Sequence, residues 1–113
     1  MSDFDAYQEH TSNTAIYPDA GTGSIRALAY VGLGLGEAGE VQGKVKKILR
    51  DAAGIVTDEH REAIAAELGD VLWYVARMAT EIKMPLGNIA QMNLDKLDDR
   101  KNRNVLKGSG DNR

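Results

Sequence analysis

Two short acidic motifs stand 30 positions apart in the sequence and share the pattern acid-x-Gly-acid-Val. The first is Glu37-Ala38-Gly39-Glu40-Val41, and the second is Glu67-Leu68-Gly69-Asp70-Val71. On a helix with about 100° per residue, the first acid of each motif lies roughly 40° from the valine, inside the apolar arc, and the second acid lies at its edge. Burying unpaired carboxylates costs several kcal/mol, so four inward acids on neighbouring helices require cations between them.

Carboxylate oxygens favour a hard cation, and the predicted metal is therefore Mg²⁺, with Mn²⁺ as a substitute. The predicted metal ligands are Glu37, Glu40, Glu67 and Asp70. Glu37 and Glu40 are also the predicted catalytic residues, because either could orient or deprotonate the attacking water. A single E-x-x-E pair is usually a solvated helix face. Two such pairs that both face inward instead indicate a site. Each motif also contains a glycine, which costs about 1 kcal/mol in a helix and is explained if a backbone or ligand approaches closely there.

Two other kinds of site fit the sequence less well. Di-iron bundles use Glu-x-x-His pairs, whereas His10 and His60 do not stand at i+3 from an acid of either motif. Residues 34–39 match the dinucleotide pattern G-x-G-x-x-G, but that pattern needs a preceding strand and a βαβ unit. The flanking residues have helical periodicity, so we do not expect a dinucleotide site.

Four helices are expected to position the acids, over residues 3–14, 25 to about 51, 58 to about 82, and 85 to about 100. Ser24 and Thr57 are suitable N-caps for the two long helices. No segment shows sustained alternation with β-branched residues, which argues against a sheet. The predicted fold is all-α: a four-helix bundle-like single domain over residues 1–113, oligomeric, with a polar C-terminal tail at 102–113.

The bulk composition excludes several function classes. The chain has 113 residues, 42% of them hydrophobic and 27% charged, with a net charge of −3 and no cysteine. Without cysteine there is no disulfide, thiolate nucleophile or Cys-ligated metal. The negative charge argues against nucleic-acid binding. No apolar run approaches the roughly 20 residues that span a membrane, and the acidic, polar N-terminus is unlike a secretory signal, so we expect a cytoplasmic protein.

The residues around the two motifs resemble the MazG-like all-α nucleoside triphosphate pyrophosphohydrolase family, whose signature is E-x-x-E followed, after some tens of residues, by E-x-x-D. The resemblance covers most of the chain and includes Tyr17-Pro18, residues 33–41, Lys46-Lys47, residues 67–74, residues 93–97 and residues 100–103. It implies hydrolysis of an NTP or dNTP to the monophosphate and pyrophosphate, by a dimer or tetramer, in nucleotide-pool control or house-cleaning. It further implies a compact, single-domain member, and we expect no counterpart of the second domain of the long family members.

Six residues are predicted to contact the substrate: Lys44, Tyr74, Asn93, Lys96, Arg100 and Lys107. Lys44 and Tyr74 each follow a metal acid by seven residues, about two helical turns along the same face. Asn93 interrupts an apolar stripe, and a buried Asn needs partners, which a nucleotide could supply. The alternative is a polar residue that fixes helix register. Lys107 lies in a Gly/Ser-containing tail, where closure over the phosphates and plain disorder are equal alternatives.

A homodimer or homotetramer is expected, because Leu33, Leu35, Leu49 and Leu72 broaden the apolar arcs beyond what one chain can cover. A partner could bring its residues 7–17 near the acids. No residue specifies the base, and our expectation is a purine nucleotide such as dGTP or GTP, with pyrimidine and damaged bases as alternatives. Besides the hydrolase, a catalytically idle nucleotide- or metal-binding bundle and a structural oligomerisation domain remain open.

Overall fold

The computed structural model describes residues 3–105, and all regular structure in this range is helical. In chain order the elements are α1 (Asp3–His10), η1 (Thr11–Thr14), α2 (Ile25–Gly34), η2 (Leu35–Glu37), α3 (Ala38–Asp51), α4 (Asp58–Glu81) and α5 (Leu86–Asn102), where η marks a 3₁₀ turn. The prediction of an all-α fold is thus confirmed for the described part of the chain. Among these residues, no helix is both long enough and apolar enough to cross a membrane.

The two long helical segments begin at the residues that the sequence predicted. The Ser24 hydroxyl accepts a hydrogen bond from the Ala27 backbone N–H at 3.2 Å. At α4, the Thr57 side chain accepts from the His60 N–H at 3.2 Å, and His60 Nδ1 accepts from the Thr57 N–H at 3.1 Å. These bonds satisfy N–H groups that have no partner within the helix, so both starts are well determined.

The predicted helix over 25–51 is divided by η2, and the expectation of one continuous α-helix was wrong at this point. Gly34 ends α2 and Gly36 lies within η2, and both glycines lower the helix propensity of this stretch. Gly34 also meets a close neighbour, because a Cβ atom added to it would lie 2.1 Å from Cε1 of Tyr74. Tyr74 can therefore approach the backbone only where residue 34 has no side chain.

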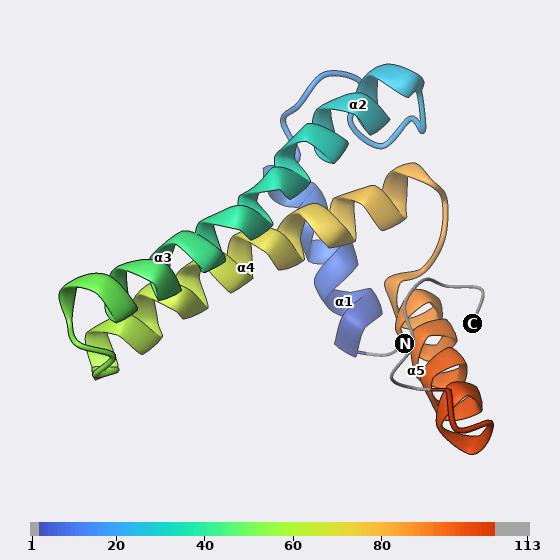
Figure 1. The fold of residues 1–113 in the computed structure, drawn as a ribbon. Coiled ribbons are helices and arrows are strands. Elements are labelled where there is room, and N and C mark those ends of the chain that lie inside the picture. Colours follow the sequence, from blue (N-terminus) through green and yellow to red (C-terminus); the bar gives the residue numbers. More distant parts are fainter. Residues whose placement is uncertain (1–2, 106–113) are drawn as a thin grey trace.

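Figure 1 shows α3 and α4 lying side by side as an extended arm, with α2 continuing the direction of α3 and α1 crossing α4. Helix α5 packs on α1 and α4. Apart from the adjoining η2, α3 contacts α4 alone among the described elements. The predicted four-helix bundle is therefore not closed within one chain.

Two small apolar clusters form the core. One consists of Tyr17, Ala27 and Val31, and the other of Ala76, Ala79 and Leu86. Trp73, Tyr74 and Met78 pack against the first cluster, while Tyr7, Val75 and Ile89 pack against the second. Helix α4 contributes side chains to both clusters, so it joins the two parts of the core.

The chain leaves much of its apolar surface uncovered. Among the described residues seven hydrophobic side chains are buried, whereas fourteen large ones are exposed. The exposed set includes Leu33 at 84%, Leu49 at 68% and Leu72 at 38%, as their places on the predicted arcs suggested. The radius of gyration is 16.9 Å, against about 13 Å for a compact domain of roughly 100 residues. One chain is thus an open structure with a thin core.

Candidate metal centre

Three of the four predicted metal ligands come together beside the middle of α4. Glu37 is the last residue of η2, and Glu67 and Asp70 stand three residues apart on α4. One carboxylate oxygen from each of the three lies within 4.8 Å of the others. Positions i and i+3 share a helix face, so α4 presents two acids toward the acid that η2 supplies.

The surroundings of Glu67 fit a metal cation. Its Oε2 atom is buried without a hydrogen-bond partner, and its Oε1 atom lies 3.7 Å from Nζ of the half-buried Lys44. Three carboxylates against one ammonium leave an excess of two negative charges at this point. Buried polar atoms are normally satisfied, and a divalent ion with oxygen ligands would satisfy Glu67 and balance the charge.

A pocket of about 270 Å³ adjoins the acids and is lined by Glu37, Asp70, Trp73 and Tyr74. The Trp73 and Tyr74 rings meet edge to face, with centroids 5.2 Å apart and an interplanar angle of 89°. The pocket thus combines two carboxylates with an aromatic wall. Trp73 both packs against the core and lines this pocket.

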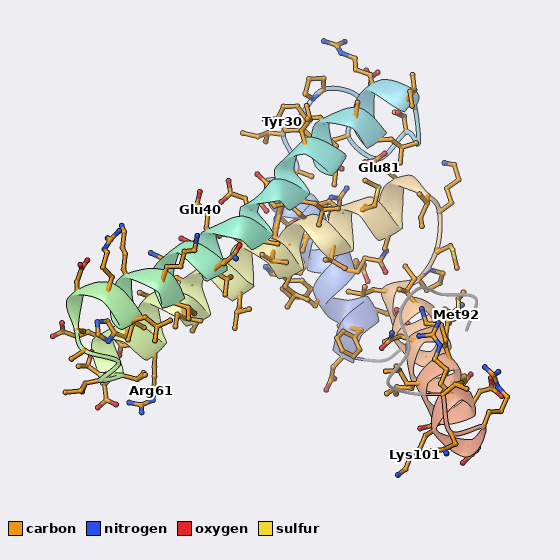
Figure 2. The ribbon with its side chains drawn as sticks, in the orientation of Figure 1. Tyr30, Glu40, Arg61, Glu81, Met92 and Lys101 are labelled. Atoms are coloured by element: carbon orange, nitrogen blue, oxygen red, sulfur yellow. The ribbon has the colours of Figure 1, made fainter. Side chains whose placement is uncertain are left out.

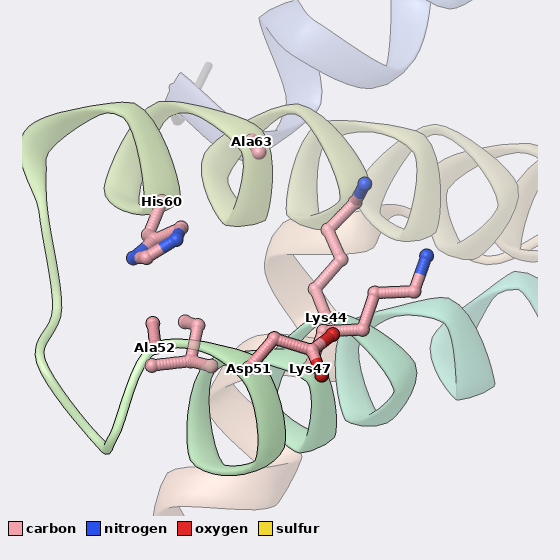
Figure 3. A pocket seen from close by; sticks show the side chains of 7 residues that line it. Lys44, Lys47, Asp51, Ala52, His60 and Ala63 are labelled. Carbon is pink, nitrogen blue, oxygen red and sulfur yellow. The ribbon is translucent and has the colours of Figure 1, made fainter.

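A second pocket, of about 380 Å³, lies between α3 and α4 near their turn (Figure 3). It is lined by Lys44, Lys47, Ile48, Asp51, Ala52, His60 and Ala63. Lys44 links the two parts of the site, because it lines this pocket and pairs with Glu67. The metal centre therefore has an aromatic pocket on one side and a lysine-bearing pocket on the other.

Glu40 does not join the other three acids. It is exposed, lies outside the group of close carboxylates, and stands on the outer side of α3 (Figure 2). Glu37 ends η2 whereas Glu40 stands in the first turn of α3, so the two acids belong to different elements, and of the two it is Glu37 that lies close to the acids of α4. Of the predicted substrate contacts, Lys44 and Tyr74 are at the site.

The predicted contacts on α5 lie apart from the acids within one chain. Asn93 is exposed, Lys96 is half-buried and Arg100 is 3% exposed. Within the described range α5 makes no contact with α2, η2 or α3. The expectation that Asn93 is buried was wrong for the single chain, in which its side chain is exposed. Lys107 lies outside the described residues.

Sequence reasoning missed a buried carboxylate, Glu81, which is 2% exposed. Its oxygens accept hydrogen bonds from the Tyr17 hydroxyl and from the backbone N–H groups of Gly21 at 2.7 Å and Gly23 at 2.8 Å. Burial alone would raise the pKa of Glu81, but these bonds and nearby Arg77 lower it below its usual value. Nothing in the local pattern distinguishes Glu81 from a surface acid.

Residues 7–17 cover their own α4. Arg77, 3% exposed, donates to the Tyr17 hydroxyl and to Thr11 Oγ1, each at 3.2 Å. Burial raises the pKa of Tyr7, and the nearby Asp70 carboxylate raises it further. The segment that was expected to reach the acids of a partner therefore already approaches those of its own chain.

The chain is similar to one described protein family and to one phage protein. A family model described as the MazG nucleotide pyrophosphohydrolase domain matches residues 27–105. The gene 37 protein of Mycobacterium phage L5 is 56% identical over 111 residues, which cover 96% of this chain and 97% of the phage protein. No solved structure matches the chain. The range matched by the family model includes all four predicted metal ligands.

Proposed function

The chain belongs to the MazG nucleotide pyrophosphohydrolase family, and from this premise we propose that it hydrolyses a nucleoside triphosphate to the monophosphate and pyrophosphate with Mg²⁺, for which Mn²⁺ can substitute. The observation that carries the proposal is the group of Glu37, Glu67 and Asp70, with a buried Glu67 oxygen that has no partner in the chain. The proposed substrate is a purine nucleotide such as dGTP or GTP, and the proposed role is nucleotide-pool control or house-cleaning.

In this proposal Glu37, Glu67 and Asp70 hold the metal, and Glu40 joins them through a side-chain or subunit rearrangement. Mg²⁺, when bound, neutralises phosphate charge and makes water more acidic. Glu37 lines the aromatic pocket beside Asp70, so its carboxylate is better placed than that of the exposed Glu40 to orient the attacking water and accept its proton.

The reaction balances with water as the other reactant. The water oxygen forms a bond to a phosphorus atom of the α–β anhydride and gives up a proton to the Glu37 carboxylate. The bridging P–O bond breaks, and the bridging oxygen leaves with the other phosphate group, so that the nucleoside monophosphate and pyrophosphate separate. Lys44, 3.7 Å from Glu67, supplies a positive charge beside the acids. A preorganised cation near developing phosphate charge stabilises the transition state.

We further propose that the active unit is a homodimer or homotetramer. The exposed apolar side chains on α2, α3 and α4 would pack against a second chain. The same assembly could bring Asn93, Lys96 and Arg100 of one chain to the acids of another, since α5 does not reach η2 or α3 of its own chain.

Pyrophosphate release from a panel of NTPs and dNTPs, with and without Mg²⁺, tests the proposal. We expect Glu37→Gln, Glu67→Gln and Asp70→Asn each to lower kcat by at least about 10²-fold, because each removes charge from the metal site. Glu62→Gln is the matched control, since Glu62 is an exposed acid on α4 outside the group. Metal binding without turnover of any nucleotide would favour an idle binding bundle, and neither property would favour a structural domain.

A further inference from the structure

One face of α4 holds the N-terminal segment in place beyond the metal centre. Trp73, Arg77 and Glu81 follow one another at four-residue intervals and so share a face of the helix. Each is hydrogen-bonded to residues 11–23. Figure 2 places Glu81 between α4 and α2. The face begins one turn after Asp70, so the segment is held directly beside the acids.

The bonds to Glu81 determine the position of Tyr17. Both side chains are buried, at 2% and 7% exposure. Replacing a buried ion pair by well-packed apolar residues is often neutral or stabilising, and in some proteins such buried polar groups instead fix one conformation among several. Here the Tyr17 hydroxyl meets both Glu81 and Arg77, whose guanidinium also lies 5.8 Å from the Tyr17 ring centroid. Tyr17 is therefore held at its hydroxyl and at its ring.

Tyr17 in turn contacts the wall of the acid pocket. Its ring meets that of Trp73 edge to face, with centroids 6.3 Å apart and an interplanar angle of 84°. On the same segment, Thr14 Oγ1 accepts a hydrogen bond from Trp73 Nε1 at 2.8 Å. Trp73 lines the pocket together with Glu37 and Asp70. Displacing the segment would thus move an aromatic wall that adjoins two carboxylates.

We propose that Glu81 is a positioning residue of the pocket: through Tyr17 and the segment that carries Thr14, it fixes the Trp73 ring against which the nucleotide binds. The proposal rests on the proposed function, because it assigns Trp73 a contact with that substrate. Glu81 itself does not touch the nucleotide.

Three variants each remove one contact between Glu81 and Trp73. Glu81→Gln removes the negative charge of the carboxylate, and Tyr17→Phe removes the hydroxyl but keeps the ring. Thr14→Val removes the hydroxyl that accepts the hydrogen bond from Trp73 Nε1. Thr14 is exposed, so its variant should fold even if Glu81→Gln does not. Ser12→Ala is the control on the same segment, because the exposed Ser12 hydroxyl bonds only locally, to the Glu9 carbonyl at 2.7 Å.

Trp73 is the single tryptophan of the chain, so fluorescence reports on the pocket wall without turnover. We expect the three variants to change its emission and lower its anisotropy, and to raise the KM for nucleotide about fivefold, the effect of one lost hydrogen bond, with kcat within about twofold of wild type. Ser12→Ala should match wild type.

A merely structural role for Glu81 would lower the active fraction, so kcat would fall while KM and the emission of the folded protein stayed unchanged. That pattern in folded Tyr17→Phe and Thr14→Val would overturn the proposal. If the wild-type protein released no pyrophosphate, the proposed function would fail, and unchanged Trp73 emission and anisotropy in the variants would separately refute the link from Glu81 to the pocket wall.

Discussion

The substitution Gly34→Ala tests whether the Tyr74 ring lies directly against the backbone of residue 34. The Gly34 backbone is helical, with φ −63° and ψ −28°, so alanine is allowed there by its dihedral angles. The new Cβ would lie 2.1, 2.5 and 2.6 Å from three ring atoms of Tyr74. A real Cβ atom essentially never lies within 3.0 Å of such a neighbour, so the Tyr74 ring must move by about 1 Å. The edge-to-face contact with Trp73 restricts that movement.

The cost follows from overpacking. We expect about 1–3 kcal/mol of destabilisation, or roughly 4 °C in Tm per kcal/mol for a chain of this size. Because Tyr74 lines the acid pocket, kcat/KM should fall by up to about 10²-fold, as a displacement of about 1 Å can cause. Thermal melting and pyrophosphate release measure both effects.

Gly36→Ala is the matched control, because a Cβ there would meet nothing within 4 Å. It should leave stability and turnover close to those of wild type. If Gly34→Ala matched Gly36→Ala in both Tm and kcat/KM, the reasoning about Tyr74 would be refuted.

Three further outcomes are expected. Mg²⁺ should raise the Tm of wild type and of Glu62→Gln but not that of Glu67→Gln. Without metal, the Tm of Glu67→Gln should equal or exceed that of wild type, because repulsion among the acids is reduced. If Mg²⁺ raised the Tm of Glu67→Gln as much as that of wild type, Glu67 would not be a metal ligand. The pKa of Glu81 is lowered in the fold, so its contribution to stability is present above the usual value of 4.5 and is lost as pH falls through the folded value. Denaturant titrations should therefore show a smaller loss of stability at acid pH in Glu81→Gln, and an identical loss would contradict this. Leu33→Ser and Leu49→Ser should shift an oligomer toward monomer in light scattering across a dilution series, because both are exposed apolar side chains on the surface proposed to pack against a second chain. An unchanged mass across the series would show that no chain packs there.

Helix periodicity and capping chemistry predicted most of the fold. Ser24 and Thr57 mark helix starts because their side chains satisfy free N–H groups locally, and such local bonds are visible in sequence. The turn at η2 was not predicted, because the apolar spacing continues through it and the contact between Gly34 and Tyr74 joins residues far apart in the chain.

The candidate site was likewise predicted only in part from the sequence. Glu37, Glu67 and Asp70 were found because helical spacing places them inward, and the structure groups them. Glu40 has the same motif spacing but lies on the exposed side of α3. Glu81 was missed since its partners are Tyr17 and backbone N–H groups about 60 residues earlier, which no local pattern connects.

The most direct test of the central claim is the identity of the products. The wild-type protein would be incubated with dGTP and Mg²⁺, and ³¹P NMR would follow the phosphates with time. The account predicts dGMP and pyrophosphate in equal amounts, and no products when EDTA replaces Mg²⁺. Inorganic phosphate and dGDP, or no turnover of any nucleotide in the panel, would contradict it.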